Sequence, residues 1–473
     1  MFIGRERELK TLEEIYGKNG FGMIVIYGRR RIGKSTLIRE FLKGKKSIFY
    51  TATKVGAERN LELFSKQVMD TLEPNYPDIV FPSVEGILDV ITNKLEAEKE
   101  KLVLVIDELP YWAEKNEALL SVLQKYMDTK WLDKNFMVIL CGSALSFMEK
   151  KVLSEKSPVF GRRDAQIKLE AFNYRESALF VPDYSAEDKA ICYGVTGGVA
   201  KYLALFDASK SLDDNIKKLF FNPDGYLFDE TKNLLTQEFS DVTIANNIIE
   251  QIAAGENSLN IIASKVHEKD ATVLYSLEKL IGVGLVEKKN CITEEKNRKK
   301  TQYVLKDHMF KFWYQFIPKA ISVIEIGQGE LYYEKIVKPK IHEFMGSVFE
   351  QMCRLYTLEQ GIQGTLGSFI TETGTWWGVE QINKEGKRYQ QSADIDVVGI
   401  SSIDHTAVLG ECKFRNEKID KEIYETLIRR KDLISGNYIV TKYLLFSLRG
   451  FTAWFDSAEI TNTILLTLDD LYL

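Results

Sequence analysis

The sequence has few histidines and cysteines, and their spacing excludes several kinds of site. Its 473 residues include four histidines, which form no H-x-x-H pair. The five cysteines are scattered, and no two lie close enough for a metal site or a thioredoxin-type motif; they are Cys141, Cys192, Cys291, Cys353 and Cys412. Thiols distributed in this way are typical of the reducing cytoplasm, which is the compartment that we expect.

Long apolar runs are also missing. The longest, such as MIVIY, LVLVI and FMVIL, are far shorter than the roughly 20 residues that a membrane span needs. The first ten residues, MFIGRERELK, carry charge from Arg5 onward and contain no apolar segment of a signal peptide. We therefore expect no membrane partner.

Neither sign of charge dominates the composition. The 63 basic and 68 acidic side chains give a net charge of -5, which argues against extensive coating of nucleic acid. Any contact with DNA would thus come from a local basic patch. With 45% hydrophobic and 28% charged residues, the composition excludes a disordered tail, a collagen-like rod and a disulfide scaffold. At about 150 residues per domain, the length predicts about three domains.

The first third of the chain alternates short apolar runs with helical patterns. The runs are continuous rather than alternating, which predicts an α/β domain over residues 1–172 whose mostly parallel sheet is covered on both faces. Strands are expected at Met23–Tyr27, Ser47–Thr51, Leu102–Ile106, Phe136–Cys141 and Gln166–Leu169, and helices at Lys34–Leu42, Ala57–Thr71 and Glu117–Met127. Residues 173–240 are predicted to form a helical lid, interrupted by Gly197 and Gly198.

A phosphate-binding loop is the most specific motif. A full G-x-x-x-x-G-K-S/T pattern follows the first expected strand and opens the first expected helix, as phosphate binding requires. Its glycines allow backbone N–H groups to surround phosphates, Lys34 would reach the β- and γ-phosphates of ATP, and the Ser35 hydroxyl would hold Mg²⁺. The predicted cofactor-binding residues of the loop are Gly28, Arg29, Arg30, Arg31, Ile32, Gly33, Lys34, Ser35 and Thr36. The alternative is an ordinary glycine-rich turn.

An acidic pair ends the apolar run Leu102–Ile106. Asp107 would organise Mg²⁺ and Glu108 would polarise the attacking water. A helix N-cap aspartate is the alternative, but the upstream phosphate loop favours catalysis.

Two further residues are candidates for ATP chemistry. Ser143 follows the strand Phe136–Cys141, where a polar side chain would sense the γ-phosphate; a plain helix N-cap is the alternative. Arg162, in Gly161-Arg162-Arg163, could stabilise charge in the transition state, or could simply be a solvated surface residue.

Together these motifs resemble the archaeal-type ATPase family, close to the STAND branch of the AAA+ superfamily. The resemblance covers residues 1 to about 235 and rests on the motifs above with Phe2-Ile3-Gly4-Arg5-Glu6 and Thr196-Gly197-Gly198. It implies that the segment with Ile3 and Arg5 lines an adenine pocket. One departure is Ala200, where relatives often carry proline, and this weakens any lid role taken from the family.

Residues 241–325 are predicted to form a winged helix-turn-helix domain. The pattern is three helices, the third at Asp270–Ile281, followed by two strands around Leu285–Lys288 and Gln302–Leu305. The third helix is poor in basic residues, so major-groove reading is not favoured. The basic wing tip Lys296–Lys300 suits phosphate contacts, although a solvated hairpin or a protein-docking module would look the same.

The C-terminal part, residues 335–473, contains a second acidic constellation. Asp396 lies on one strand-like run, and Glu411 and Lys413, two residues apart on another, share a face of it. Two carboxylates at adjacent strands, such as Asp396 and Glu411, bind Mg²⁺ in metal-dependent nucleases, and a lysine positions water. Glu350, on a preceding helix, would complete the site.

The arrangement resembles the PD-(D/E)XK, restriction-endonuclease-like α/β domain that accompanies archaeal-type ATPases. An inactive relative and a coincidental sheet edge are the alternatives. The pair Trp376-Trp377 favours core packing over base stacking.

The sequence therefore predicts a parallel-sheet P-loop ATPase core with a helical lid, a winged-helix domain and a nuclease-like C-terminal domain. We expect an Mg²⁺-dependent ATPase that drives or gates a DNA-acting nuclease domain, with double-stranded DNA recognised at weak sequence selectivity. A nucleotide-switched regulator that binds DNA or protein without cleavage is the main alternative, and a motor or chaperone-like ATPase is the third. The sequence leaves the oligomeric state open, a homo-oligomer included.

Overall fold

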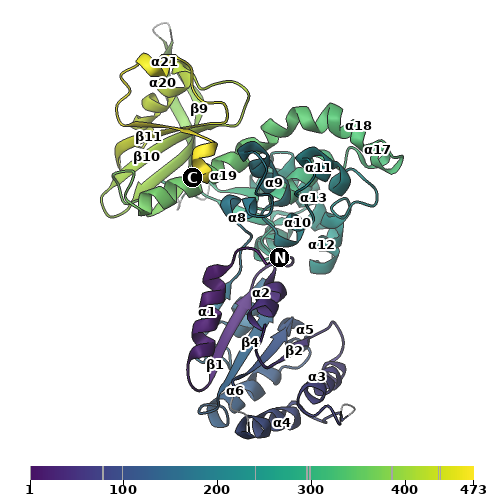
Figure 1. Ribbon diagram of the computed structural model, residues 1–473. Helices are drawn as coiled ribbons and strands as arrows, with labels where there is room; N and C mark the ends of the chain where they lie inside the picture. Colours follow the sequence, from purple (N-terminus) through teal and green to yellow (C-terminus); the bar gives the residue numbers. More distant parts are fainter. Residues whose placement is uncertain are drawn as a thin grey trace. The chain divides into compact units, whose positions relative to one another are not determined.

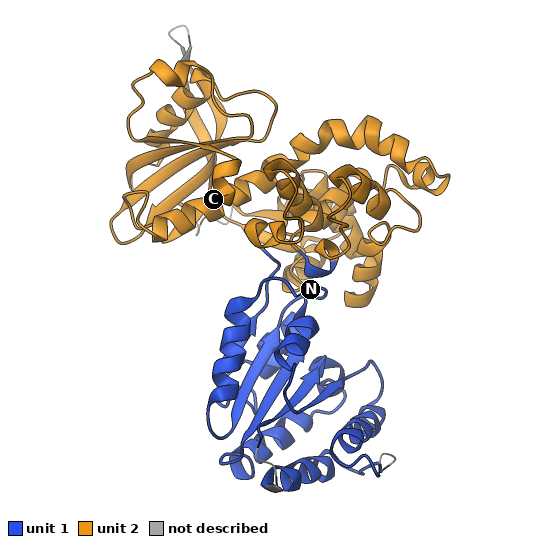
Figure 2. Ribbon diagram, viewed as in Figure 1, with its two compact units in different colours: residues 1–172, 199–201 blue, residues 173–198, 202–473 orange. Residues whose placement is uncertain are grey.

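The computed structural model describes residues 2–76, 79–97, 100–239, 241–294, 297, 300–384, 387–434, 436 and 438–473. The chain divides into two compact units (Figure 2). Unit 1 runs to Phe172 and also includes Val199–Lys201, whereas unit 2 comprises Asn173–Gly198 and Tyr202–Leu473. Among the described helices, none combines the length and the apolar character that crossing a membrane requires.

Unit 1 is built on a five-stranded parallel sheet with the order β2-β3-β4-β1-β5 (Figure 1). Its strands are β1 (Gly22–Tyr27), β2 (Ser47–Thr51), β3 (Leu102–Asp107), β4 (Phe136–Gly142) and β5 (Ala165–Lys168). Every residue of β1, β3 and β4 is buried, as continuous apolar runs predict for strands covered on both faces.

Helices cover both faces of this sheet. They are α1 (Glu6–Gly17), α2 (Lys34–Phe41), α3 (Ala57–Leu72), α4 (Val84–Ala97), α5 (Leu109–Ala113), α6 (Leu119–Thr129) and α7 (Leu145–Phe147). Alternate residues of β1 join opposite cores: Met23 and Val25 pack in the cluster with α3, α4 and α6, while Ile24 and Ile26 pack in the cluster with α1 and α2. The predicted parallel-sheet core is confirmed, and α1, α4 and α5 are among the helices present beyond the three that the sequence analysis names.

The strand order determines which loops meet. Because all five strands are parallel, the loops after β1, β3 and β4 lie at one edge of the sheet, and the residues before each strand lie at the other edge. The neighbours β3, β4 and β1 bring Asp107, Gly142 and Tyr27 to the first of these edges.

Unit 2 begins with helices. They are α8 (Tyr174–Ala178), α9 (Ala186–Thr196), α11 (Leu212–Phe220) and α12 (Glu230–Glu238), while α10 (Ala200–Leu203) begins in the segment assigned to unit 1. Tyr174 Oη and Arg175 Nε both donate to the Leu471 carbonyl, at 3.0 and 2.8 Å, and Arg175 also pairs with Glu359. Residues expected to act as a lid of the ATPase core are thus packed against the C-terminal end of the chain.

Three helices and a small antiparallel sheet follow. The helices are α13 (Val242–Ala253), α14 (Leu259–Val266) and α15 (Asp270–Gly282), and the sheet pairs β6 (Val286–Lys289) with β7 (Gln302–Leu305). The predicted wing-tip residues Lys296, Arg298 and Lys299 lie outside the described residues. Next come α16 (His308–Phe316), α17 (Ile321–Glu325) and α18 (Gly329–Tyr332).

The C-terminal part is a separate α/β domain with a mixed sheet. Helix α19 (Ile341–Ile362) precedes strands β8 (Glu372–Lys384), β9 (Lys387–Ser401) and β10 (Thr406–Lys413). Strand β9 lies between β8 and β10 and pairs antiparallel with both. Helix α20 (Lys421–Arg429) then connects β10 to β11 (Ile439–Ser447), and α21 (Trp454–Ser457) precedes β12 (Thr463–Thr467); β10, β11 and β12 are parallel. The prediction of a strand near Phe369–Thr371 was wrong, because the first strand of this sheet starts at Glu372 and forms a long hairpin with β9.

Candidate nucleotide site and carboxylate cluster

The loop between β1 and α2 adopts a conformation that depends on glycine. Three of its residues have positive φ: Gly28 at +154°, Arg31 at +70° and Gly33 at +92°. A Cβ on Gly28 would lie 2.3 Å from the carbonyl oxygen of Leu169, so no other residue fits there. Helix α2 begins at the end of this loop without a side-chain cap, which leaves its first N–H groups available to an anion.

Lys34 lies folded over this loop. Its side chain is buried, and Nζ donates to the carbonyls of Gly28 and Arg29, at 2.9 Å each. Charge-assisted hydrogen bonds to phosphate oxygens are stronger than bonds to neutral carbonyls. The ammonium group is therefore already placed inside the curve of the loop, where a phosphate would bind.

The start of α2 and the end of β3 meet through a hydroxyl and a carboxylate. Ser35 Oγ donates to Asp107 Oδ2 at 2.8 Å, and the other oxygen, Oδ1, accepts from the backbone N–H of Glu108 at 3.0 Å. Asp107 is buried. A hydroxyl and a carboxylate are the oxygen donors that Mg²⁺ prefers, so the two residues present suit this ion.

Glu108 is held by Ser143. Oε2 of Glu108 accepts hydrogen bonds from the Ser143 backbone N–H at 3.2 Å and from Ser143 Oγ at 2.7 Å. Glu108 itself has φ of +51°, a left-handed conformation at the turn from β3 to α5. The candidate γ-phosphate sensor thus contacts the carboxylate expected to polarise water.

Arg5 anchors the N-terminal segment to the phosphate loop. It is 7% exposed, Nη2 donates to the carbonyls of Glu170 at 2.6 Å and Ile32 at 3.5 Å, and its guanidinium lies 4.0 Å from the centre of the Phe172 ring. Ile3, expected with Arg5 at an adenine pocket, is half-buried. In the loop, Arg30 donates to Tyr111 Oη, and Thr36 is exposed in the first turn of α2.

Arg162 does not join the other candidates. It precedes β5, at the edge of the sheet opposite the phosphate loop, where the neighbouring Asp164 accepts from the Met23 N–H at the start of β1. Its guanidinium makes a bidentate pair with Asp128, at 2.7 and 2.8 Å. A role for Arg162 at the phosphate loop of its own chain is not supported, because the loop follows β1 whereas Arg162 comes before a parallel strand.

The segment with Ala200 contacts the phosphate loop. The Lys201 N–H donates to the Arg31 carbonyl at 3.0 Å, and a Cβ built on Gly33 would lie 3.4 Å from Ala200 Cβ. Sequence reasoning missed this contact, since a backbone bond from Lys201 leaves no side-chain signal.

The C-terminal sheet brings three of its four predicted residues together. Nζ of Lys413 donates to Glu411 Oε1 at 2.5 Å and lies 3.8 Å from Asp396 Oδ2. The same Asp396 oxygen accepts from the Cys412 N–H at 3.0 Å, across the pair β9 and β10. Glu411 Oε2 is buried and has no hydrogen-bond partner within the described part of the chain.

Glu350 approaches this group from α19. Arg354, one turn later, pairs with Glu350 Oε2 at 3.3 Å and donates to the Asp396 carbonyl at 2.9 Å. Burial and the charges of Glu411 and Glu350 raise the pKa of Asp396 well above its usual range. Among the described residues, no three His, Cys, Asp or Glu side chains surround a common metal position. Glu350 is instead held by Arg354, a residue that no sequence motif indicated.

The basic wing and the tryptophans have structural partners. Lys300, the described basic residue of the predicted wing tip, pairs with Glu294 at 2.5 Å and donates to the Trp377 carbonyl at 3.1 Å. Trp376 is 6% exposed and packs in the core of the C-terminal sheet. In α15, Lys279 lies over the ring of the exposed Tyr275.

Known proteins resemble both parts of the chain. Residues 2–206 match a family described as an ATPase domain predominantly from Archaea, and residues 313–424 match one described as archaeal and bacterial proteins of unknown function. An uncharacterized protein of Methanocaldococcus jannaschii is 28% identical over 438 residues, 92% of each chain. An uncharacterized ATP-binding protein of that organism is 48% identical over 46 residues, 10% of this chain and 78% of that one.

One solved structure shares the fold over a large part of the chain. A Walker-type ATPase of Pyrococcus abyssi has a TM-score of 0.52 at 19% identity, and the match covers 66% of this chain and 96% of that one.

Proposed function

We propose, from the premise that residues 2–206 of this chain are an ATPase domain of the archaeal type, that this domain binds ATP with Mg²⁺ and hydrolyses it. The observation that carries the proposal is the meeting of the phosphate loop with Asp107 and Glu108 at one edge of the sheet, through the bond from Ser35 to Asp107. The loop conformation and the position of Lys34 add to it.

Each residue of this edge has its own role in the proposed reaction. Lys34 leaves the carbonyls of Gly28 and Arg29 for the β- and γ-phosphates, and the loop N–H groups hold the phosphate oxygens. Ser35 and Asp107 would hold Mg²⁺, which when bound neutralises charge on the phosphates. Glu108, oriented by Ser143, accepts a proton from the attacking water.

Replacing Lys34 tests this proposal. Lys34→Ala should abolish phosphate release from ATP, because the curve of the loop then lacks the ammonium group that contacts the β- and γ-phosphates. Lys43→Ala is the matched control, since this lysine lies two residues past α2 and pairs with Glu40 on the surface. Full turnover in Lys34→Ala would refute the assignment.

A second activity is proposed for residues 335–473, metal-dependent cleavage of phosphodiester bonds. Support comes from the approach of Asp396, Glu411 and Lys413 to one another and from the buried Glu411 Oε2, which has no partner among the described residues and suits a metal ion. Asp396 and Glu411 would hold Mg²⁺, Lys413 would position the attacking water, and Glu350 would complete the set after leaving Arg354.

Cleavage is tested on DNA with Mg²⁺ or Mn²⁺. Asp396→Ala and Lys413→Ala should each remove cleavage of plasmid and single-stranded DNA while ATP hydrolysis continues, because the ATPase residues lie in the other unit. If the unmutated protein never nicks DNA with either ion, the catalytic part of this proposal fails, and a nuclease-like fold that binds without cutting replaces it.

DNA is the proposed partner of unit 2. The three helices α13 to α15 with the β6–β7 pair support a winged-helix assignment for residues 241–325, between a lid at 173–240 and the nuclease-like domain. Measuring ATP hydrolysis with and without linear DNA, while following nicks, separates this function from that of a regulator that binds without cleavage. A cytoplasmic location is also proposed, and the five cysteines support it because all of them are free thiols.

A further inference from the structure

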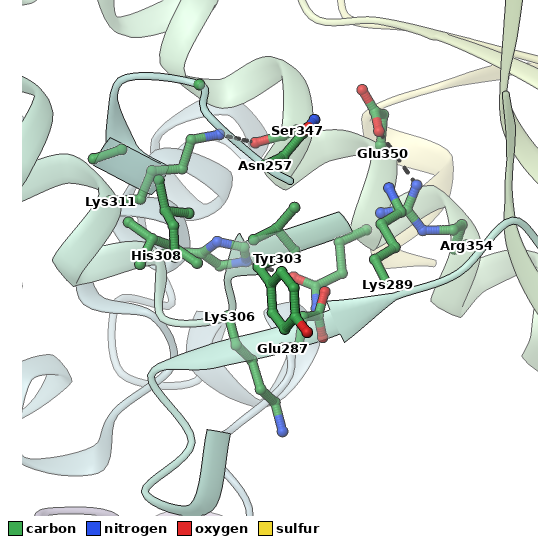
Figure 3. A pocket seen from close by; sticks show the side chains of 16 residues that line it. Asn257, Glu287, Lys289, Tyr303, Lys306, His308, Lys311, Ser347, Glu350 and Arg354 are labelled. Atoms are coloured by element: carbon green, nitrogen blue, oxygen red, sulfur yellow. Dashed lines mark hydrogen bonds and ion pairs between the residues drawn. The ribbon is translucent and has the colours of Figure 1, made fainter. Parts of the chain in front are cut away.

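A cleft runs along α19 between the β6–β7 pair and the C-terminal domain, all within unit 2. One cavity of about 290 Å³ is lined by residues of β6, β7, α16 and α19 (Figure 3). A second, of about 460 Å³, continues toward β8. The two share Glu287, Lys289, Gln351 and Arg354, so they adjoin at these side chains.

The first cavity carries an excess of positive charge. Four cationic residues line it against two carboxylates; the cations are Lys289, Lys311, Arg354 and Lys306, whose exposed side chain points away from the others in Figure 3, and the acids are Glu287 and Glu350. Figure 3 shows Lys311 directed to Ser347, and Arg354 to Glu350. No carboxylate of the described residues lies within ion-pair distance of Lys289, whose ammonium lies 5.7 Å from the centre of the Trp377 ring. Burial lowers the pKa of both Lys289 and Lys311, so an anion in the cavity would offset an existing cost.

A buried acceptor also lines this cavity. The His308 ring is buried, its Nε2 lies 2.5 Å from Gln351 Oε1, and its Nδ1 has no hydrogen-bond partner within the described part of the chain. Burial lowers the pKa of His308 to about 4, so the ring is neutral near pH 7. With the proton on Nε2 facing Gln351, Nδ1 accepts from a ligand that offers an amino or hydroxyl group.

The cavity borders the carboxylate cluster. Glu350 lines it, and Arg354, which also lines it, donates to the Asp396 carbonyl at 2.9 Å. An anion beside Arg354 would compete for the guanidinium that now holds Glu350. Entry of a phosphate would thereby free Glu350 to join Asp396 and Glu411.

We propose that this cleft binds one unstacked nucleotide of a nucleic acid strand, its phosphate between Lys289, Lys311 and Arg354, next to the carboxylate cluster. The inference rests on the function proposed for residues 335–473 and names the substrate of that site. A cavity of about 290 Å³ is at the lower end of small-ligand pockets, so it takes a single nucleotide and excludes a stacked base pair. Tyr303, which lines the same cavity, offers an aromatic wall for a base. Single-stranded or frayed DNA is therefore the preferred substrate, rather than intact duplex.

Strand binding is measured without cleavage, in EDTA, by fluorescence anisotropy of a labelled single-stranded oligonucleotide and of its duplex. Lys289→Gln and Lys311→Gln should each weaken single-strand binding by roughly tenfold and reduce the salt dependence by about one phosphate contact. Lys288→Gln is the matched control, because this neighbouring lysine is exposed and alternates to the other face of β6. It should change the affinity by less than about twofold, as expected for a solvated charge. Circular dichroism checks that each variant is folded.

Several outcomes would overturn the inference. Equal losses in Lys288→Gln and Lys289→Gln, tighter binding of duplex than of single strand, or no binding at all would each do so. If a deoxynucleoside monophosphate competes as strongly as the unlabelled oligonucleotide does, the cleft binds a free nucleotide. That result would overturn the proposal that it binds a nucleic acid strand. If Lys289-dependent binding is found but DNA is never nicked, only the proposed cleavage fails, so the two failures are distinguishable.

Discussion

Ser143, which follows β4, holds the second of the two acidic residues after β3, Glu108. Its backbone N–H and hydroxyl both reach the same oxygen of Glu108, so the carboxylate has one orientation before any nucleotide binds. Under the proposed function, the serine would both orient Glu108 and respond to the γ-phosphate.

Removing the hydroxyl separates these bonds. In Ser143→Ala the backbone bond to Glu108 remains and the hydroxyl bond is lost, so we expect kcat for ATP hydrolysis to fall by roughly tenfold with little change in KM, because the bond acts on the transition state. Ser143→Thr, which keeps the hydroxyl, should retain most of the activity. Steady-state phosphate release gives both constants, and a rise in KM alone would contradict the assignment.

We expect His308 to make unit 2 less stable in acid. Its pKa is about 4 in the folded chain, against an ordinary value of 6.5, chiefly because of burial, with Lys311 and Arg354 also disfavouring the charge and Gln351 and Asp307 favouring it. The unfolded chain therefore binds a proton between these values and the folded chain does not, so stability is lost as pH falls from about 6.5 toward 4. The full effect is on the order of 3 kcal/mol.

The substitution His308→Gln tests this pH dependence. A glutamine stays neutral, so the loss of unfolding temperature between pH 7.5 and pH 5 should be smaller in the variant than in the unmutated protein. The variant also loses the edge contact with Tyr193, which lowers stability equally at all pH values. A pH slope identical in both proteins would contradict the assignment.

At the scale of elements, the sequence predicted the parallel sheet of unit 1 well. Runs such as Leu102–Ile106 are apolar throughout because both faces of the strand are covered. Such a run can be recognised in the sequence without knowing which strands lie beside it. The hairpin of β8 and β9 was missed over much of its length. Residues Glu372–Lys384 mix polar, glycine and aromatic side chains at the outer strand of the sheet, where only one neighbour constrains them.

The same contrast applies to the sites. Asp107 and Ser35 follow motifs whose spacing implies their meeting, because both lie at the carboxyl edge of a parallel sheet. Arg162 comes before the expected strand Gln166–Leu169, so the parallel sheet alone places it at the edge away from the phosphate loop. Arg354 carries no motif at all, and its importance follows only from contacts with Glu350 and Asp396 that the tertiary fold creates.

Helix α19 offers a matched pair of glycines. A Cβ on Gly361 would lie 2.3 Å from Ile370 Cβ, whereas nothing lies within 4 Å of one on Gly346. Gly361→Ala should therefore push α19 away from the segment before β8 and destabilise unit 2 by about 1–3 kcal/mol. Gly346→Ala should be neutral or stabilising by up to about 1 kcal/mol, since alanine favours a helix. Thermal unfolding of both variants decides this, and equal behaviour would contradict the packing argument.

At the scale of the whole molecule, the two proposed phosphate chemistries belong to different units. The phosphate loop with Asp107 and Glu108 belongs to unit 1, and the cluster of Asp396, Glu411 and Lys413 belongs to unit 2. The net charge of -5 is compatible with both, because the cations that matter are local: Lys34 inside the loop, and Lys289 and Lys311 along the cleft. A small net charge would limit non-specific retention of DNA, so the proposed binding would depend on these few side chains.

If the ATPase gates the C-terminal domain, binding of the two ligands must be coupled, and the coupling must be reciprocal. We expect a non-hydrolysable ATP analogue to change the affinity for single-stranded DNA, and DNA to change the affinity for the analogue by the same factor, because linkage requires it. Couplings of this kind are typically about 5- to 150-fold. Titrations of each ligand in the presence and absence of the other measure both factors.

Lys34→Ala should remove the effect of the analogue on DNA binding. Lys289→Gln should weaken DNA binding and leave analogue binding in the absence of DNA unchanged. Affinities that ignore the other ligand would show that the two units act independently, and the gating hypothesis would then fail even if both activities were present.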